Sequence, residues 1–456
     1  MYLNADYTYD ACSLLSQAAA PRGPAKIRGR DTITMPQTTS EKILSRAMGR
    51  TVRAGEVIEP VPDIVFVHDW YAATVGRVLE DHGIEKLAEP EKVVFVTDHE
   101  PLAVSPEAAQ RQKKVRDLVQ KYRIGRFFDV GRGGHGHVFP VEMGLIHPGM
   151  YVAAYDTHVP NYGAVGALGI PYLTEIADVL AFGSVWLRVP KTVRVRVSGK
   201  LGPWVSVRDV AQKLLADLDP EIVDYTTVEF SGEGLQNLPF DARFTLCNTP
   251  IEIGAKSAIV VPDGMTRAYM AARGLPDPDM VHSDPDADFA LEVECRLDDV
   301  PPQVALPPRP DNVAPITAAL GVPVHHAFIG SCASGLLSDL RSAAAVLRGR
   351  KIAPTVRMFI TPATHAIYAE ASAEGLIQVF AEAGAIVTAP GCGPCAAGRI
   401  APLAPGETSI NTGTRNDPGR LGPSDSPIYL ASAASVACAA VAGVITDPRD
   451  MMGNAS

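Results

Sequence analysis

Three cysteines in the last third of the chain have a spacing that suits an iron-sulfur cluster. Cys332 follows Ile329-Gly330-Ser331, and Cys392 and Cys395 form a Cys-x-x-Cys motif. A structural zinc site normally has four protein ligands, and a redox Cys-x-x-Cys pair needs no distant third thiol. A 4Fe-4S cluster on three thiolates instead leaves one iron open to act as a Lewis acid on a substrate oxygen. The alternative is that these thiols are small apolar core residues.

Acidic and imidazole side chains follow several short apolar segments in the first half of the chain. Strands are predicted over residues 64–67, 93–96, 126–130 and 151–155. Helices predicted near 70–80 and 107–122 alternate with them, which is typical of a mostly parallel α/β sheet. Ligands bind outside the carboxyl ends of such strands, so we expect the polar residues found there to converge: Asp98, His99, His137, Asp156 and His158.

Two further pairs of side chains are candidates for substrate contacts. Asn248 and Glu252 lie four residues apart, a spacing at which they could share one face of a helix. Arg415 and Arg420 flank a glycine-containing loop beyond the cysteines, and a guanidinium fork suits a carboxylate. Exposed arginines are also common without any ligand, so this assignment depends on where the loop lies.

The elements that position these residues divide the chain into segments. A length of 456 residues allows about three domains. A half-exposed strand at 192–197 begins a new pattern, and the proline-rich stretch 300–310 is predicted to be a linker. We predict a poorly ordered N-terminal extension followed by three α/β domains, the last of which carries the cysteines: residues 1–38, 39–191, 192–300 and 301–456.

Composition narrows the class of protein. The net charge of −10 and the lack of a strong basic run argue against nucleic acid as the main partner. Seven cysteines scattered through a long chain do not resemble a disulfide framework, which favours the cytoplasm. No apolar run approaches the roughly 20 residues of a membrane span, and the first residues lack a signal-peptide pattern.

Two other cofactors fit parts of the sequence. Gly131 to Gly136 matches G-x-G-x-x-G after a strand, and Asp156 lies 20 residues further on, as in a dinucleotide site. That fingerprint must open a helix, whereas Pro140 follows almost at once. A zinc hydrolase on His135, His137 and His158 is the second alternative, but it leaves the three cysteines unexplained.

The motifs together resemble the aconitase superfamily from about residue 38 to the end. In particular, the chain is similar to large subunits of 3-isopropylmalate dehydratase in their shorter archaeal and homoaconitase-like forms. The matching stretches are Thr97-Asp98-His99, Gly136-His137, Asp156-Thr157-His158, Leu246-Cys247-Asn248, Ile251 to Lys256, Ile329 to Cys332, Pro390 to Cys395, Arg415-Asn416 and Gly419-Arg420.

This resemblance implies a three-domain α/β body with mostly parallel sheets around a central iron-sulfur cleft. The 4Fe-4S cluster would be held by Cys332, Cys392 and Cys395, and His99, oriented by Asp98, would protonate the leaving hydroxyl. The remaining roles carry over by position. His137, Asp156, His158 and Glu252 would surround that hydroxyl, Asn248 would lie beside the cluster, and Arg415 and Arg420 would bind substrate carboxylates.

Several positions depart from the usual pattern of that family. Ala333, Ser334 and Thr414 stand where the family has amide or hydroxyl residues near the cluster. Val138 replaces a usual glutamine, and His68-Asp69-Trp70-Tyr71 replaces a loop that is built of small residues in the family. Cluster and dehydratase chemistry are expected to survive these changes. The substrate stays open between a 3-isopropylmalate-type acid of leucine biosynthesis and a different hydroxy acid of a specialised pathway.

The resemblance also implies a missing component. In the superfamily a serine, accompanied by an arginine in a Gly-Ser-Ser-Arg-type loop on a swivelling fourth domain, acts as the catalytic base. No such segment occurs in these 456 residues. We therefore expect a separate small subunit, about the size of one domain, that carries this serine.

Overall fold

The computed structural model describes residues 35–453, and its first element is the helix α1 (Thr39–Met48). Residues 1–34, which make up most of the predicted extension, lie outside the described part. Thr38 caps α1, because its backbone N–H donates to the Glu41 carboxylate at 2.8 Å while its hydroxyl accepts from the Glu41 N–H. Gly49 ends the helix in a left-handed conformation, as its position in the sequence predicts.

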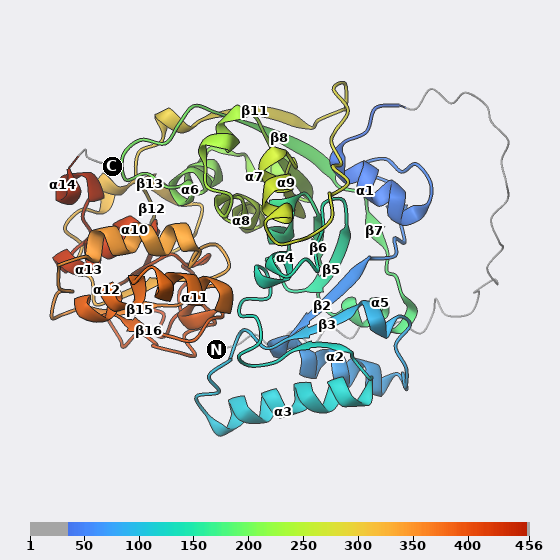
Figure 1. The fold of residues 1–456 in the computed structure, drawn as a ribbon, viewed down its shortest axis with the longest axis horizontal. Helices are drawn as coiled ribbons and strands as arrows, with labels where there is room; N and C mark the ends of the chain where they lie inside the picture. The colour runs from blue at the N-terminus through green and yellow to red at the C-terminus, as the bar shows by residue number, and fades with distance from the viewer. Residues whose placement is uncertain (1–34, 454–456) are drawn as a thin grey trace. The chain divides into compact units, whose positions relative to one another are not determined.

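The first sheet is parallel throughout and has five strands. Its order is β4-β3-β2-β5-β6, with bounds Arg126–Phe128, Val93–Val96, Ile64–His68, Tyr151–Tyr155 and Leu168–Pro171. Val65 and Val67 pack in one core cluster with residues of α2 (Asp69–Asp81) and α3 (Pro106–Lys121), which lie together in Figure 1. Ile64 and Phe66 belong to a different cluster, so both faces are buried, as expected for uninterrupted apolar strands.

The second sheet is also parallel, with the order β10-β9-β8-β11. Its strands are Ser257–Val260, Thr226–Ser231, Lys191–Ser198 and Leu291–Arg296. The helices α6 (Val207–Asp217) and α8 (Ala242–Asn248) pack on it through an apolar core of their own. Gly163, in the 3-10 helix η3 (Val159–Val165), lies against this sheet so closely that an added Cβ would come within 1.9 Å of the Ala258 carbonyl oxygen.

The third sheet has seven strands and is mixed. Its order is β13-β12-β18-β17-β14-β15-β16, with bounds Val313–Pro315, Gln303–Ala305, Ile428–Ala431, Ser409–Asn411, His326–Ile329, Arg357–Ile360 and Ile386–Val387. Only the pairings of β12 with its two neighbours are antiparallel. The helices around it are α10 (Leu337–Leu347), α11 (His365–Ala373), α12 (Leu376–Ala383) and α13 (Ala433–Ala442).

Two predictions of local structure are wrong in this last region. The stretch predicted as a linker contains β12, because Gln303–Ala305 pairs with β13 and β18 despite its proline neighbours. The alanine-rich stretch 429–445 predicts one buried helix, but the helix begins only at Ala433, and the preceding Ile428–Ala431 is β18, paired in parallel with β17. Strands of three or four residues carry too little periodicity to be distinguished from a loop or a helix end.

Shorter elements complete the described part of the chain. They are β1 (Val57–Ile58), β7 (Leu187–Arg188), α4 (Phe139–Glu142), α5 (Ile176–Phe182), α7 (Pro220–Val223), α9 (Gly264–Ala271) and α14 (Pro448–Met452). Each of the three larger sheets takes its strands from one of the three predicted domain ranges, and the domain boundaries themselves stay a prediction. Among residues 35–453, no helix is long and apolar enough to cross a membrane.

Candidate active site

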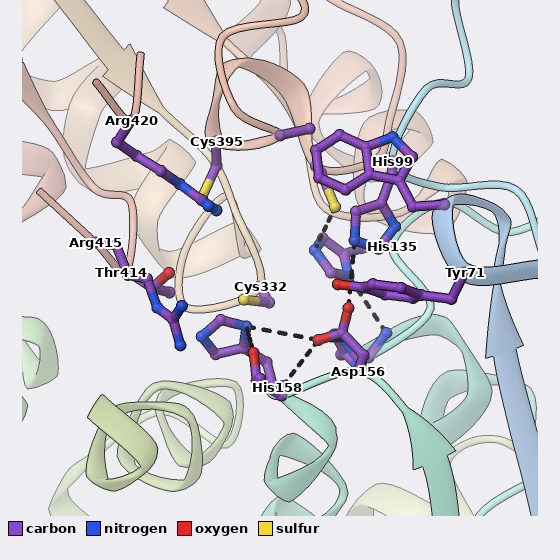
Figure 2. A pocket seen from close by; sticks show the side chains of 15 residues that line it. Tyr71, His99, His135, Asp156, His158, Cys332, Cys395, Thr414, Arg415 and Arg420 are labelled. Carbon is purple, nitrogen blue, oxygen red and sulfur yellow. Dashed lines mark hydrogen bonds and ion pairs between the residues drawn. The ribbon is translucent and has the colours of Figure 1, made fainter. Parts of the chain in front are cut away.

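One cavity of about 120 Å³ gathers most of the residues that the sequence singles out (Figure 2). Nine of the twelve predicted site residues line it: His99, His137, Asp156, His158, Cys332, Cys392, Cys395, Arg415 and Arg420. The other three, Asp98, Asn248 and Glu252, lie behind this lining. Asp98 is hydrogen-bonded to His99 and Glu252 to His158, both of which line the cavity, whereas Asn248 is hydrogen-bonded to Asn161. The lining comes from the strand ends of the first sheet and from loops of the third.

The three thiols reach the cavity from two turns of the third sheet. Cys332 follows β14, and Cys392 and Cys395 lie in the turn after β16, which includes the 3-10 helix η8 (Gly393–Cys395). The Cys392 N–H donates to the Asp98 carbonyl oxygen at 2.9 Å, which ties this turn to the loop after β3. Gly391 allows the approach, since its φ is 147° and an added Cβ would come within 2.6 Å of that oxygen.

The surroundings of the thiols suit a bound cluster. Burial raises the pKa of the Cys392 thiol well above its ordinary value, and a bound metal would favour the thiolate form of this sulfur. Burial opposes ionisation of Cys395 as well, but Arg420 and the Thr414 backbone N–H lower the pKa of its thiol below the usual value. Two buried cysteines, Cys332 and Cys392, and the half-buried Cys395 face one cavity with a guanidinium beside them, a donor set that fits an anionic 4Fe-4S cluster with three thiolate ligands.

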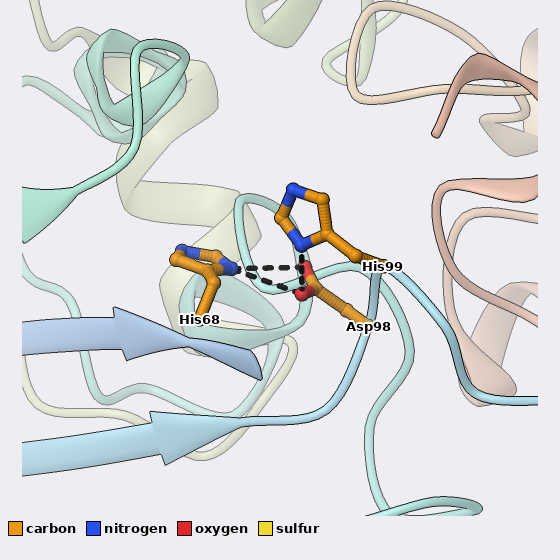
Figure 3. Close-up of side chains that lie close together, drawn as sticks. All are labelled: His68, Asp98 and His99. Atoms are coloured by element: carbon orange, nitrogen blue, oxygen red, sulfur yellow. Dashed lines mark hydrogen bonds and ion pairs between the residues drawn. The ribbon is translucent and has the colours of Figure 1, made fainter. Parts of the chain in front are cut away.

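Asp98, just beyond the carboxyl end of β3, is hydrogen-bonded to two imidazoles (Figure 3). Its Oδ1 lies 2.9 Å from His99 Nδ1 and 3.0 Å from His68 Nδ1, and its Oδ2 accepts the Gly136 N–H at 2.8 Å. Burial by itself raises the pKa of the Asp98 carboxyl, but the two histidines lower it well below its ordinary value. Asp98 is therefore a carboxylate that fixes the orientation of the His99 ring.

The other nitrogen of His99 faces the cavity. His99 Nε2 lies 3.3 Å from Asp156 Oδ2, and His137 Nε2 lies 3.1 Å from Asp156 Oδ1. Burial lowers the pKa of His99, yet the Cys392 thiolate and the Asp98 carboxylate raise it well above its ordinary value. Burial lowers the pKa of His137 to about 4. The pKa values of the two histidines around Asp156 are thus shifted in opposite directions.

Glu252 connects the histidine side of the cavity to the arginine side. Its Oε1 lies 2.7 Å from His158 Nε2, and its Oε2 accepts from Arg415 Nε at 2.9 Å. Asn248 acts through a second amide: its Nδ2 donates to Asn161 Oδ1, and Asn161 Nδ2 donates to the Cys332 carbonyl oxygen, both at 2.7 Å. Asn248 therefore holds the backbone of Cys332 in place through Asn161, and it does not line the cavity.

Comparison with known proteins decides the family. The model of the aconitase family (aconitate hydratase) matches residues 41–321 and 317–443. The chain belongs to the aconitase family. It is 38% identical to the 3-isopropylmalate dehydratase large subunit 1 of Methanopyrus kandleri, over 91% of this chain and 99% of that one. It is 41% identical to the homoaconitase large subunit of Thermus thermophilus, over 91% and 98%.

The solved structure of aconitase X from Thermococcus kodakaraensis, in its holo-form, is also similar. It covers 83% of this chain and 93% of its own, with a TM-score of 0.46 and 13% identity. The predictions of an aconitase-like α/β fold and of a hydro-lyase of the 3-isopropylmalate dehydratase type are confirmed by the family match and the curated relatives.

The geometry of this aconitase-family chain gives no support to the two alternative cofactors. After Gly136 the chain forms only α4, a helix of four residues with Pro140 in it, so no phosphate-binding helix opens there. In residues 35–453, the groups of three metal-binding atoms within 4.8 Å of one another are His68-Asp98-His99 and Asp98-His135-Cys392. The trio proposed for zinc, His135, His137 and His158, is not among them.

One predicted local arrangement in this family member is wrong. Asn248 and Glu252 do not share a regular helix, because α8 ends at Asn248 and the 3-10 helix η5 (Thr249–Ile253) follows. Pro250, which lacks an N–H, lies in the first turn of η5. The change of helix type separates the two side chains, so that Asn248 is directed to Asn161 and Glu252 to His158.

Several residues around the site were not among the twelve predicted site residues, and four of them show what the sequence could and could not indicate. His68 and Asp69 end β2 and begin α2, so the strand-end argument that selected Asp98 could have found them. His135 Nε2 lies 3.2 Å from Cys392 Sγ, and its sequence signal was its place in the same glycine-rich loop as His137. Arg208, buried in α6, donates to the Gly413 carbonyl oxygen, and no local pattern indicated it.

Proposed function

We propose that this chain is the cluster-bearing large subunit of a two-subunit dehydratase that isomerises a 2-hydroxy dicarboxylic acid of the 3-isopropylmalate type. One observation carries the proposal: three thiols, an oriented histidine and two arginines line a single cavity. The names of the relatives, 3-isopropylmalate dehydratase and homoaconitase large subunits, support the same class of reaction.

Cys332, Cys392 and Cys395 would hold the cofactor, a 4Fe-4S cluster. When bound, such a cluster supplies a Lewis acid at its open iron. Asn161 and Asn248 would keep the Cys332 turn in place, because their amides connect its carbonyl oxygen to α8. The Arg420 guanidinium beside Cys395 would offset part of the negative charge of the thiolates.

His99 would act as the acid that protonates the leaving hydroxyl. Asp98 fixes the ring through Nδ1, which leaves Nε2 free to face the cavity and Asp156. After the hydroxyl has left as water, the same imidazole can take a proton from water when the double bond is hydrated at the neighbouring carbon. His137, Asp156 and His158 would keep this water oriented in the cavity.

Arg415 and Arg420 would bind the substrate's carboxylates. Arg415 is held by Glu252 through Nε, so its terminal nitrogens are free to donate in the manner of an arginine fork. In the view of Figure 2 both arginines lie on one side of the cavity, and His99 lies on the other. A dicarboxylate bound there would present its hydroxyl-bearing carbon between the two groups of residues.

The base that removes the proton from the neighbouring carbon would come from the partner. No residue of the described cavity lining is proposed for that step, and the words "large subunit" in the relatives' names fit a separate small subunit. We propose a complex of these two subunits in the cytoplasm, with a small-molecule hydroxy acid as substrate and without nucleic acid or membrane contacts.

A substrate other than 3-isopropylmalate is the second candidate, in a pathway other than leucine biosynthesis. Trp70 favours this possibility, because it places a large indole ring in the cavity wall. Anaerobic reconstitution with the small subunit, followed by a screen of hydroxy di- and tricarboxylates, would test both candidates. Formation of an unsaturated acid, detected by the absorbance of its conjugated double bond, is the expected result, and a reconstituted complex that dehydrates none of these acids would refute the proposal.

A further inference from the structure

Two aromatic side chains form a wall of the cavity that the proposed reaction leaves without a role. Trp70 and Tyr71 both line the cavity and are half-buried. The Trp70 ring lies 4.8 Å from the His99 ring, and the Tyr71 ring lies 5.7 Å from it in an edge-on arrangement. Tyr71 also stacks on Tyr155, the last residue of β5, with ring centroids 4.3 Å apart. The wall is thus next to the proposed proton donor.

The backbone under this wall is fixed. Trp70 and Tyr71 lie in the first turn of α2, directly after Asp69. The buried Asp69 carboxylate accepts the backbone N–H groups of His99 and Glu100, each at 3.1 Å, which joins this turn to the loop after β3. These bonds hold the first turn, from which both aromatic side chains extend, next to the loop that carries His99.

The cavity is divided by polarity as well as by position. The cationic side chains Arg415 and Arg420 lie on one side, and Tyr71 lies on the other with His99 (Figure 2). Arg399 comes near the aromatic wall, with its guanidinium carbon 5.8 Å from the Trp70 ring centroid, but it is not part of the described lining and lies 3.8 Å from Glu100. A carboxylate therefore has partners at the arginine side. On the other side the lining includes the polar His99, and the Trp70 and Tyr71 rings provide the apolar surface against which a substituent would pack.

Space at the aromatic side is limited. The cavity measures about 120 Å³, well below the roughly 300–1,000 Å³ of typical small-molecule sites, and the cluster would occupy part of the same region. Because the backbone below the two rings is held by Asp69, a larger group fits only if an aromatic side chain rotates away, which has a steric cost. Each additional carbon of a substrate group that points toward Trp70 and Tyr71 should therefore reduce binding in the transition state.

We infer that Trp70 and Tyr71 determine specificity by limiting the size of the apolar substituent on the carbon next to the hydroxyl-bearing carbon. This inference rests on the proposed function, because it concerns the substrate of the same site. It predicts a 3-alkyl malate with a small substituent, in preference to one with a bulky or aromatic substituent and in preference to a tricarboxylate.

The test uses the anaerobically reconstituted two-subunit complex and a set of malates with methyl, ethyl, isopropyl, isobutyl and benzyl groups at carbon 3, together with citrate. We expect the kcat/KM of the wild type to fall from the small to the large members. Trp70→Ala should raise kcat/KM for the isobutyl or benzyl member by about 10-fold or more, since one misfitting methylene is worth about 10- to 200-fold. Tyr71→Phe, which keeps the ring, should leave the size ranking unchanged.

Trp186→Ala is the matched control, because this tryptophan is exposed and does not line the cavity. Calorimetric binding of the same acids to the complex provides a second readout that needs no turnover. A Trp70→Ala complex with an intact cluster spectrum that changes all members by the same factor in both measurements would overturn the inference, as would a wild type that prefers the benzyl member or citrate. If no acid reacts but binding still follows the predicted size order and shifts in Trp70→Ala, the proposed reaction fails and the wall inference holds.

Discussion

His158 and Arg415 bind opposite oxygens of the Glu252 carboxylate. The two contacts, 2.7 Å to His158 Nε2 and 2.9 Å to Arg415 Nε, connect residues 94 and 163 positions away from Glu252 in the sequence. Burial opposes the charge on Glu252, but His158 and Arg415 lower the pKa of its carboxyl below the ordinary value. One carboxylate thus orients a proposed hydroxyl-binding imidazole and a proposed carboxylate-binding guanidinium together.

Replacing this carboxylate should impair both groups. We expect Glu252→Gln to lower kcat/KM on the order of 10²-fold, because removing one partner of a buried, hydrogen-bonded charge pair leaves the others uncompensated. Steady-state kinetics of the reconstituted complex measure the effect. Glu233→Gln, on an exposed part of the second sheet's surroundings, is the control, and equal activity of the two variants would contradict the proposed role.

The cluster ligands can be tested without measuring activity. Serine at position 332, 392 or 395 should abolish retention of iron and the visible absorption of the cluster after anaerobic reconstitution. Cys438→Ser should retain both, because Cys438 lies in α13 and does not line the cavity. Wild-type protein that binds zinc stoichiometrically and no iron would refute the assignment.

The proton donor has its own prediction. His99→Ala and Asp98→Asn should each reduce turnover by about 10²-fold or more, since positioned general acids typically contribute this much. Both variants should keep the cluster spectrum, because neither residue is a proposed ligand. Full turnover in either variant would show that the assigned role is wrong.

The proposed small subunit predicts the behaviour of the isolated chain. Purified and reconstituted alone, this chain should turn over substrate very slowly, since no base would be held within the roughly 3 Å that proton abstraction requires. Adding a small subunit should restore turnover in proportion to the complex formed, which kinetics combined with sedimentation can measure. Full activity of the single chain would mean that it supplies a base of its own.

Stability should depend on pH through Asp339 in α10. Burial and the nearby Asp241 raise the pKa of its carboxyl to about 7. The folded protein therefore holds this proton more tightly than the unfolded chain, so the stabilising contribution is present below about pH 4 and is lost as the pH rises to about 7. Melting temperatures of the apoprotein between pH 5 and 8 should fall less steeply for Asp339→Asn than for the wild type. Asp425→Asn, at an exposed position, should follow the wild type, and parallel curves for all three proteins would contradict this prediction.

The sequence by itself determined four of the five strands of the first sheet, all but β6, and the residues at the carboxyl ends of these four. Three of these strands are short apolar runs with polar residues or turn residues at their ends: Ile64–His68, Val93–Val96 and Tyr151–Tyr155. Such a run can be recognised from neighbouring residues alone. Because parallel strands place their carboxyl ends at one edge, the convergence of Asp98 and Asp156 followed from the pattern. The aconitase family was likewise legible from motif order, and the family match confirms it.

Only the tertiary structure decided how the segments meet. Three contacts join residues that lie between 30 and 171 positions apart in the sequence. They are the ion pair of Glu252 with Arg415, the hydrogen bond of Asp98 with His68, and the hydrogen bond of Asn161 with the Cys332 carbonyl oxygen. The strands β12 and β18 also depend on tertiary structure, because they become recognisable only through their pairing with each other and with neighbouring strands. Three or four residues are too few to show the alternation that is typical of a strand. These contacts are selected by the packing of three sheets against one another, and no local pattern encodes that packing.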